Sequence, residues 1–359
     1  MPRQRQVDRL LVATTILTAT AGVVMVASAS GPLAREAYGV PEFEFAFRQL
    51  VAVLLGAGAM LAATFVPLHH LLKPHVALGG LGITWVALVV PYLQRPINGA
   101  HRWLQLPVGS LQPSALAKVA LPLALASWVA YCRARRETPE RTFYPALAIT
   151  GLTVLLVLAA PDLGSAFLLL AGAVAVLVLA EIPWKPLVVL GGGTVLMVVV
   201  AILAKPYRIE RVRSFFGETS YQVQQSLIAI GGGGVLGRGL GESTQKLFFL
   251  PYPHTDFIFA VVGEEIGLWG TTLTLALLGV IVVRALRAAH RSPTLGTGLL
   301  AAGLAVTLAV QTLINTSVCL KLMPAKGLPL PLLSAGGSDV LVTMIAIGLV
   351  LNVGKEGAQ

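Results

Sequence analysis

Long apolar runs alternate with short polar segments along nearly the whole chain. They cover ten stretches: 10–29, 46–66, 76–93, 113–132, 143–160, 163–181, 186–204, 257–283, 296–318 and 333–353. An α-helix needs about 20 apolar residues to cross the hydrocarbon core of a bilayer. The pattern therefore predicts an all-α polytopic membrane protein of about ten transmembrane helices. We interpret 1–359 as a single transmembrane domain, with one long polar loop, 205–255, between the seventh and eighth spans.

The composition agrees with this pattern and excludes two other classes of protein. Hydrophobic residues make up 56% of the 359 residues, and charged residues make up only 12%. A soluble globular domain carries about 25% charged residues. This chain has about half that share, which is too little charge to cover the surface of a soluble protein. Disorder requires the opposite balance, with low hydrophobicity and high net charge. The first apolar run is longer than the core of a signal peptide, so we expect it to remain as an uncleaved helix.

The net charge of +10 is explained by membrane topology. Ten spans place both termini on one side of the membrane. Thirteen lysines and arginines then flank the spans on that side, whereas five lie in the short loops on the other side. Because cytoplasmic loops are enriched in basic residues, we predict that both termini are cytoplasmic and that the 205–255 loop is extracytoplasmic. No nucleic acid is needed to account for the charge.

Charged residues within or beside the apolar runs gather near their extracytoplasmic ends. Arg48 lies near the start of the second run, and Lys118 lies about one turn into the fourth. Asp162 lies between the fifth and sixth runs, and Asp256 opens the eighth. Charged groups in membrane spans are costly and usually mark function. Acids and bases at one depth on different helices predict a shared polar cavity.

Asp256 has two interpretations. It follows His254 and Thr255 and is flanked by aromatic and aliphatic residues. Partial desolvation disfavours the charged form of a carboxylate and suits a general base. Alternatively, Thr255 or Asp256 simply caps the eighth helix. Two turns deeper in the same predicted helix, Glu264 could approach the cavity or form a structural pair with a base on another helix, whereas Glu265 points away from it.

Two loops carry further candidates. The stretch 205–213 is basic and ends at Arg213. The glycines of 231–241 could bring backbone N–H groups to a phosphate, or form a flexible turn at the membrane surface. The last loop, 321–338, contains too many prolines and glycines to span a membrane. Irregular backbone at membrane depth is tolerated only where it lines protein or water, so we expect this loop to form a wall of the cavity.

Five motifs resemble those of the SEDS proteins, the shape, elongation, division and sporulation family that includes RodA, FtsW and SpoVE. The motifs are NGAHRW (98–103), QPSALAK (112–118), PDLG (161–164), LPYPHTDFIFA with GEE (250–260 and 263–265) and LPLLSAGGS (330–338). The resemblance covers nearly the full length of the chain. Ala115 stands where the family usually has glutamate, and Ala335 where it has tyrosine. The first departure puts an essential role for that glutamate in doubt here.

The resemblance implies a peptidoglycan glycosyltransferase that polymerises lipid II at the outer face of the cytoplasmic membrane. Lipid II is a disaccharide pentapeptide on undecaprenyl diphosphate. Asp256 would be the general base that deprotonates the acceptor hydroxyl, with Glu264, His254 and Thr255 in supporting roles. The substrate would be bound by the following residues: Arg48, Arg102, Lys118, Asp162, Arg213, Ser334 and Ser338. Asp162 would orient Lys118 or hold a divalent cation, magnesium or manganese. The implied partners are a class B penicillin-binding protein and membrane lipid.

Three alternatives remain open at this stage. A lipid II flippase or another transporter would also have about ten spans and a polar cavity. A transporter needs a polar path through both leaflets, however, and the inner halves of the spans are apolar apart from Glu264 and Glu265. A scaffold for cell-wall assembly would leave the buried charge unexplained. Within the family, the short tails and the LPLP run (328–331) favour the elongation member, RodA, whereas STQKL (243–247) resembles the division member, FtsW.

Overall fold

A computed structural model describes residues 7–96, 100–106, 109–182 and 220–356, together with isolated positions between 188 and 209. Arg213 and most of the apolar run 186–204 lie outside the described residues. In the described part of the chain, eight helices are long and apolar enough to cross a membrane, and a ninth apolar helix is shorter. The prediction of an all-α polytopic membrane protein is confirmed.

The helices and strands follow the apolar runs closely. The long helices are α1 (Arg9–Glu36), α2 (Glu44–Phe65), α4 (Pro74–Val89), α5 (Pro113–Ala134), α6 (Pro139–Ala159), α7 (Leu163–Leu179), α12 (Gly267–His290), α13 (Leu295–Cys319) and α14 (Gly337–Glu356). The shorter elements are α3 (Leu68–Leu71), the 3-10 helix η1 (Val90–Leu93), the strands β1 (Leu104–Leu106) and β2 (Gly109–Leu111), α10 (Tyr221–Gly233) and α11 (Ile258–Glu265). The two strands form an antiparallel hairpin with Leu104 opposite Leu111. Proline occupies the first turn of α4, α5 and α6, where its missing N–H has no partner to lose.

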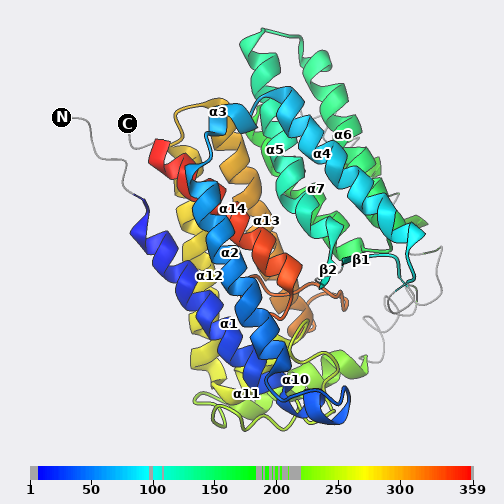
Figure 1. Ribbon diagram of the computed structural model, residues 1–359, viewed down its shortest axis with the longest axis vertical. Coiled ribbons are helices and arrows are strands. Elements are labelled where there is room, and N and C mark those ends of the chain that lie inside the picture. The colour runs from blue at the N-terminus through cyan, green and yellow to red at the C-terminus, as the bar shows by residue number, and fades with distance from the viewer. Residues whose placement is uncertain are drawn as a thin grey trace.

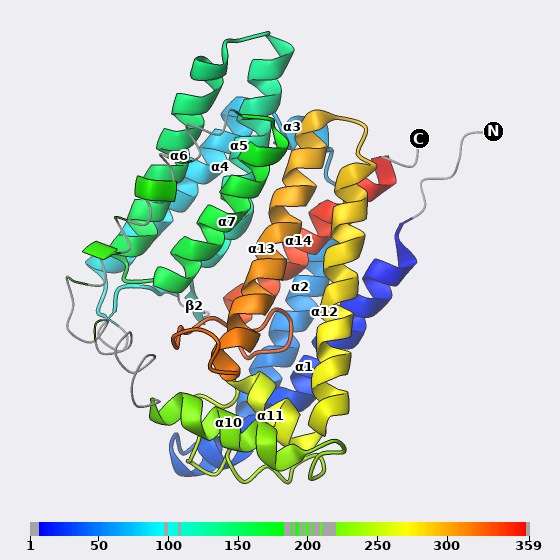
Figure 2. The ribbon, with the colours of Figure 1, turned by 180° about the vertical axis from the view of Figure 1, so that it is seen from behind.

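The long helices stand side by side in two groups, α4 to α7 in one and α1, α2, α12, α13 and α14 in the other (Figures 1 and 2). α1 begins and α14 ends at the same end of the bundle as α3, which we call the termini end. The hairpin, α10, α11 and the 320–336 loop lie toward the opposite end, which we call the hairpin end. The candidate site lies at the hairpin end.

Close contact between helices depends on glycine at two interfaces. A Cβ on Gly348 of α14 would lie 2.4 Å from the carbonyl oxygen of Met60 in α2. A Cβ on Gly303 of α13 would lie 2.7 Å from Val176 of α7 and 3.0 Å from Pro122 of α5. Small residues let membrane helices approach closely, because lipid offers no hydrophobic force to drive their association. α13 and α14 are largely buried inside the protein, so polar side chains on these two helices lie in its interior.

The predicted eighth span, 257–283, is wrong in one respect, because the chain breaks there into two helices. α11 ends at Glu265 and α12 begins at Gly267. Gly267 has a φ of 73°, and a Cβ there would lie 2.4 Å from the backbone nitrogen of Gly237. Only glycine fits this conformation and this contact. The break keeps Glu264 and Glu265 at the hairpin end with α10 and α11, and not two turns deep in a span (Figure 2).

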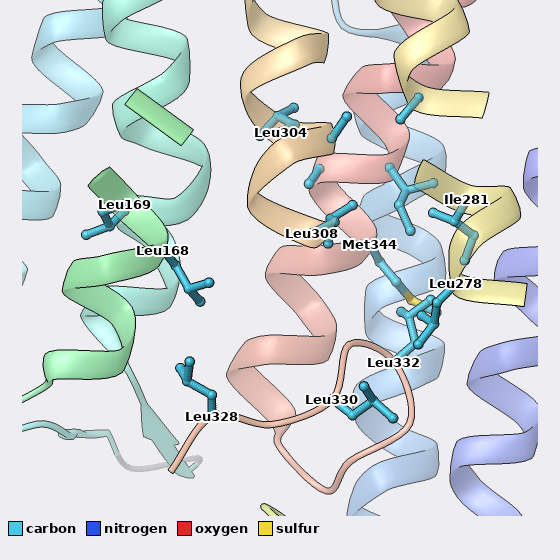
Figure 3. Close-up of a cluster of buried hydrophobic side chains, with 14 of the residues drawn as sticks. Leu168, Leu169, Leu278, Ile281, Leu304, Leu308, Leu328, Leu330, Leu332 and Met344 are labelled. Carbon is cyan, nitrogen blue, oxygen red and sulfur yellow. The ribbon is translucent and has the colours of Figure 1, made fainter. Parts of the chain in front are cut away.

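The 320–336 loop enters the protein core, as its composition indicates. Leu328, Leu330 and Leu332 are all buried. Figure 3 shows Leu328 on the side of Leu168 in α7, whereas Leu330 and Leu332 lie on the side of Leu278 in α12. Burying a leucine side chain stabilises a fold by about 1.5–3 kcal/mol. These leucines therefore hold the irregular backbone in place beside the site.

Candidate active site

Asp256 belongs to the segment that precedes α11, and its side chain lies beside the 320–336 loop. Its side chain is half-buried, and an ideal Cβ on Gly327 would lie 3.0 Å from its Oδ2 atom. Its backbone oxygen accepts a hydrogen bond of 2.9 Å from Asn315 Nδ2 of α13. α11 begins at Ile258 after Phe257 and has no side-chain cap. The helix-cap interpretation of Asp256 is therefore wrong, and the carboxylate faces the loop.

The two residues that precede Asp256 are tied to the LPLLSAGGS motif. Ser334 Oγ donates to the backbone oxygen of Thr255 at 2.6 Å and accepts from the backbone N–H of Leu330 at 2.8 Å. The N–H of Ala335 donates to the carbonyl of His254 at 2.8 Å. Ser334 is 1% exposed. Because its hydroxyl donates to Thr255 and accepts from Leu330, Ser334 fastens the backbone before Asp256 to the loop.

His254 is a neutral, buried side chain. Burial lowers the pKa of its imidazole to about 4. Its ring packs at 4.9 Å, tilted, against Phe45 near the start of α2. Nδ1 has no hydrogen-bond partner among the described residues. An imidazole that stays uncharged at neutral pH offers no cation to a diphosphate, and what the structure shows for the His254 ring is its contact with Phe45.

One face of α13 holds the loop that faces Asp256. Asn315 Nδ2 donates to Leu328 O at 2.7 Å as well as to the backbone of Asp256. One turn earlier, Gln311 Nε2 donates to Pro329 O at 2.8 Å. Residues four apart share one face of a helix. Sequence analysis missed this pair, although two amides spaced by four in an apolar run are a recognisable signal.

Lys118 is neutralised by a carboxylate that sequence analysis did not identify. Its Nζ forms an ion pair with Asp339 Oδ1 of α14 and donates to Gln311 Oε1 at 3.0 Å. The side chains of Lys118 and Asp339 are 8% and 6% exposed. The signal for Asp339 was present in the sequence, because it directly follows Ser338 at the end of a motif.

Asp162 does not orient Lys118, contrary to one of the two roles expected for it. Its Oδ1 accepts from the backbone N–H of Ser165 at 3.0 Å and caps α7. Its Oδ2 accepts from Gln112 Nε2 at 3.0 Å and Ser114 Oγ at 2.9 Å. Asp162 therefore ties the start of α7 to the start of α5. Ser338 acts similarly, because its Oγ accepts from the backbone N–H of Gln112 at 3.0 Å.

The arginines of the candidate set lie at the hairpin end but have local partners. Arg102 donates through Nε to Ala160 O at 3.2 Å and through Nη2 to Pro161 O. Arg48 is exposed and pairs with Glu44 one turn earlier in α2, at 2.7 Å. Arg213 lies outside the described residues, so its predicted role has no structural counterpart. No three acidic, histidine or cysteine side chains cluster around a metal position within the described ranges.

Glu264 and Glu265 form buried pairs that hold the 234–250 loop. Glu264 accepts from Ser243 Oγ at 2.5 Å and pairs with Arg238 at 3.2 Å. Glu265 pairs with Lys246 at 2.9 Å and accepts from Ser28 Oγ of α1 at 2.7 Å. Both glutamates are 1% exposed. The base that pairs with Glu264 comes from a loop, and not from another helix as expected.

Comparison with known proteins places the chain among bacterial cell-wall proteins. The profile of the family described as "Cell cycle protein", which groups FtsW, RodA and SpoVE, matches residues 8–359. The probable peptidoglycan glycosyltransferase FtsW of Halorhodospira halophila is 40% identical over 98% of this chain and 91% of its own length. The protein of the same name from Alcanivorax borkumensis is 38% identical over 98% and 94%.

Two solved structures share the fold over almost the whole chain. The rod shape determining protein RodA of Thermus thermophilus has a TM-score of 0.73 at 30% identity and covers 98% of both chains. A chain of a peptidoglycan synthase complex, in which polymerization and crosslinking are coordinated, has a TM-score of 0.78 at 31% identity. That comparison covers 98% of this chain and 99% of the other.

Proposed function

The chain belongs to the SEDS family of cell cycle proteins, and from this premise we propose that it is a peptidoglycan glycosyltransferase that polymerises lipid II. The observation that carries the proposal is the placement of Asp256, a half-buried carboxylate beside Gly327. Asp256 takes the proton of the acceptor 4-hydroxyl while that oxygen attacks the anomeric carbon of the donor. The bond from that carbon to the diphosphate breaks, undecaprenyl diphosphate leaves with the electron pair, and the configuration inverts.

The ties around Asp256 suit a general base, because a base must be held within hydrogen-bond reach of the proton it removes. Asn315 and Ser334 bind the backbone on either side of the carboxylate and leave its side chain facing the loop. A backbone held on both sides of the residue fixes the direction of the half-buried carboxylate. Positioning of this kind lowers the entropic part of the barrier.

We assign the leaving diphosphate to the arginines at the hairpin end, and not to Lys118. Among the described residues, Arg102 donates to two backbone carbonyls, and Arg48 pairs with one carboxylate at the surface. A guanidinium binds the charged oxygens of a phosphate more strongly than it binds an uncharged carbonyl, so a diphosphate can replace the carbonyl partners of Arg102. Lys118 is already neutralised by Asp339. Magnesium is commonly held by one or two carboxylates together with substrate phosphates, so a divalent cation, if used, would bind with the diphosphate.

The position of the buried charges favours an enzyme over a flippase. The buried charged side chains of the described residues all lie at the hairpin end: Lys118, Asp162, Lys246, Glu264, Glu265 and Asp339. A flippase needs polar groups along a path through both leaflets. The break at Gly267 removes Glu264 and Glu265 from such a path and strengthens the expectation drawn from the sequence.

We propose that the hairpin end faces the extracytoplasmic side of the cytoplasmic membrane. Basic residues gather at the termini end, in and beside the turns that join the helices there: Lys73, Arg133, Arg135, Arg136, Arg287 and Arg291. This distribution is the one expected of cytoplasmic loops. A class B penicillin-binding protein is the proposed partner, in keeping with the structural neighbour that belongs to a peptidoglycan synthase complex.

Whether the chain is an FtsW-type or a RodA-type member decides whether it acts in cell division or in elongation. The relatives from Halorhodospira and Alcanivorax named FtsW are 40% and 38% identical, whereas the Thermus RodA is 30% identical. This difference favours a division role, whereas the LPLP run favours elongation. A fluorescent fusion distinguishes them, because a division enzyme concentrates at the septum and an elongation enzyme follows the lateral wall.

The test of the proposed activity is incubation of the purified protein with lipid II, with and without the class B partner. We expect glycan polymer from the wild type and none from Asp256→Asn, which keeps the shape of the side chain but not its basicity. Glu137→Gln is the matched control, because it changes a carboxylate at the termini end. Wild-type rates from Asp256→Asn, with lipid II still bound, would remove Asp256 from the mechanism.

A further inference from the structure

The buried lysine of the QPSALAK motif has no carboxylate on its own helix. Lys118 lies in α5, and the position one turn earlier is Ala115, which is 2% exposed. Residues three apart face each other on a helix, so a glutamate at 115 would lie next to the ammonium group. The chain lacks that glutamate, and a lysine left unpaired in a membrane interior is strongly disfavoured.

Asp339, the third residue of α14, supplies the missing charge. Its Oδ1 forms the ion pair with Lys118 Nζ. Gln311 of α13 completes the group, because its Nε2 lies 3.2 Å and 3.1 Å from the two oxygens of Asp339 while its Oε1 accepts from Lys118. Three side chains from three helices therefore satisfy one another in the interior.

This group is connected to the Asp256 site through the backbone of the 320–336 loop. Gln311 Nε2 also donates to Pro329 O, two residues beyond Gly327. Asn315, one turn along α13, binds Leu328 O and the backbone of Asp256. The orientation of the Gln311 amide, which sets the loop beside Asp256, is in turn fixed by Asp339 and Lys118.

We infer that Asp339 is the counter-charge of Lys118 and a positioning residue for the Asp256 site, and that it replaces from α14 a carboxylate otherwise supplied by α5. It does not touch substrate. Its negative charge balances the ammonium of Lys118 and keeps it beside Gln311, and Gln311 then holds the loop at the depth where Gly327 meets the carboxylate of Asp256. The expected change in the polymerisation rate rests on the proposed function. The expected change in melting temperature, which reports the pairing of Lys118 with Asp339, does not.

The test moves the carboxylate back to α5. Asp339→Asn removes the charge and keeps the shape, and Ala115→Glu places a carboxylate one turn from Lys118. We expect Asp339→Asn to lower kcat for lipid II polymerisation at least tenfold with a smaller change in KM, because the loop and not the diphosphate site is disturbed. We expect the double variant Ala115→Glu/Asp339→Asn to recover most of the wild-type rate and melting temperature. Ala115→Glu alone, with two carboxylates on one lysine, is expected to gain nothing.

A second variant separates positioning from simple stability. Lys118→Met/Asp339→Leu removes both charges, and replacing a buried ion pair by apolar side chains is often tolerated by the fold. We expect this variant to melt close to the wild type but to polymerise lipid II slowly, because Gln311 has lost the groups that orient it. Full activity in this variant, or in Asp339→Asn, would overturn the inference.

The melting temperatures keep the result independent of the proposed activity. If the wild type makes no polymer, the proposed function fails, but recovery of the melting temperature by Ala115→Glu in the Asp339→Asn background still supports the pairing. A double variant that melts and polymerises no better than Asp339→Asn overturns the inference while leaving the activity of the wild type intact.

Discussion

Gly327 lies directly against the carboxylate of Asp256, with a distance of 3.0 Å between an ideal Cβ on the glycine and Oδ2 of the aspartate. A real Cβ at that distance forces the neighbour to move by a few tenths of an ångström. Small displacements of reacting groups have large effects on rate. We therefore expect Gly327→Ala to lower kcat for lipid II polymerisation by about tenfold or more while the protein still folds. The check is steady-state kinetics together with a melting curve.

The matched control for this change is Gly279→Ala in α12, where an added Cβ meets nothing within 4 Å. It should leave kcat unchanged. Equal kinetics for Gly327→Ala and the wild type would show that the loop does not set the position of Asp256.

The second prediction concerns the buried pair between Lys246 and Glu265. Lys246→Met leaves Glu265 buried with only the Ser28 hydroxyl as a partner. Removing one member of a buried ion pair typically costs about 3–5 kcal/mol, so a large fall in the free energy of unfolding is expected. Arg141→Gln, at an exposed pair with Glu137, should cost at most about 1 kcal/mol. Chemical denaturation in detergent measures both, and similar losses for the two variants would contradict the structural role of the buried pair.

The third prediction concerns the hydrogen bonds of Asp162 at the junction of α5 and α7. Asp162→Asn keeps an acceptor for the N–H of Ser165, so we expect a loss of about 1 kcal/mol. Asp162→Ala removes the partners of Gln112 and Ser114 as well, and we expect about 2–3 kcal/mol. Unfolding curves compare the two. Equal losses would show that the three hydrogen bonds do not stabilise the junction of α5 and α7.

The fourth prediction follows from the buried imidazole of His254. Its pKa is about 4 in the folded protein against 6.5 for a free histidine. The unfolded chain therefore binds the proton more readily, and stability rises with pH between about 4 and 6.5 and is level above that range. From pH 7 to pH 5 we expect a loss of about 2 kcal/mol from this group.

Melting temperatures at the two pH values test this expectation in the wild type and in His254→Gln, which lacks the titrating group. His75→Gln is the control, because His75 is exposed in the first turn of α4. The pH dependence should shrink in His254→Gln and persist in the control. A pH dependence that is unchanged in His254→Gln would mean that another group is responsible.

Apart from the break at Gly267, the apolar runs predicted the membrane helices that the structure describes, and composition predicted the irregular last loop. Apolar runs and charge bias are local properties, and each can be evaluated on one segment of the chain without knowing its neighbours. The residues that hold the site were harder to identify. Gln311 and Asn315 were overlooked inside an apolar run, and Asp339 was overlooked beside a motif. Ser334 and Ser338 were expected to bind substrate, but they tie segments of the protein to each other.

The break at Gly267 shows why the eighth span was predicted as one helix. The run 257–283 is apolar throughout except for its two glutamates, and periodicity carries no information about a turn whose cause lies elsewhere. The cause is the approach of Gly237 from the preceding loop. The same approach fixes the depth of Glu264 and Glu265, which the one-helix prediction placed too far into the membrane.

The amino-acid sequence therefore establishes the class of protein and predicts its membrane topology and the candidate base, because hydrophobicity, charge bias and motifs are properties of consecutive residues. The identity of each partner depends on the packed structure. Lys118 and Asp339 are 221 positions apart, and Ala115 removes the local partner that a reader of the sequence would expect. A buried charge must find a counter-charge wherever the packing of helices brings one, and only the meeting of α5, α13 and α14 reveals which residue it is.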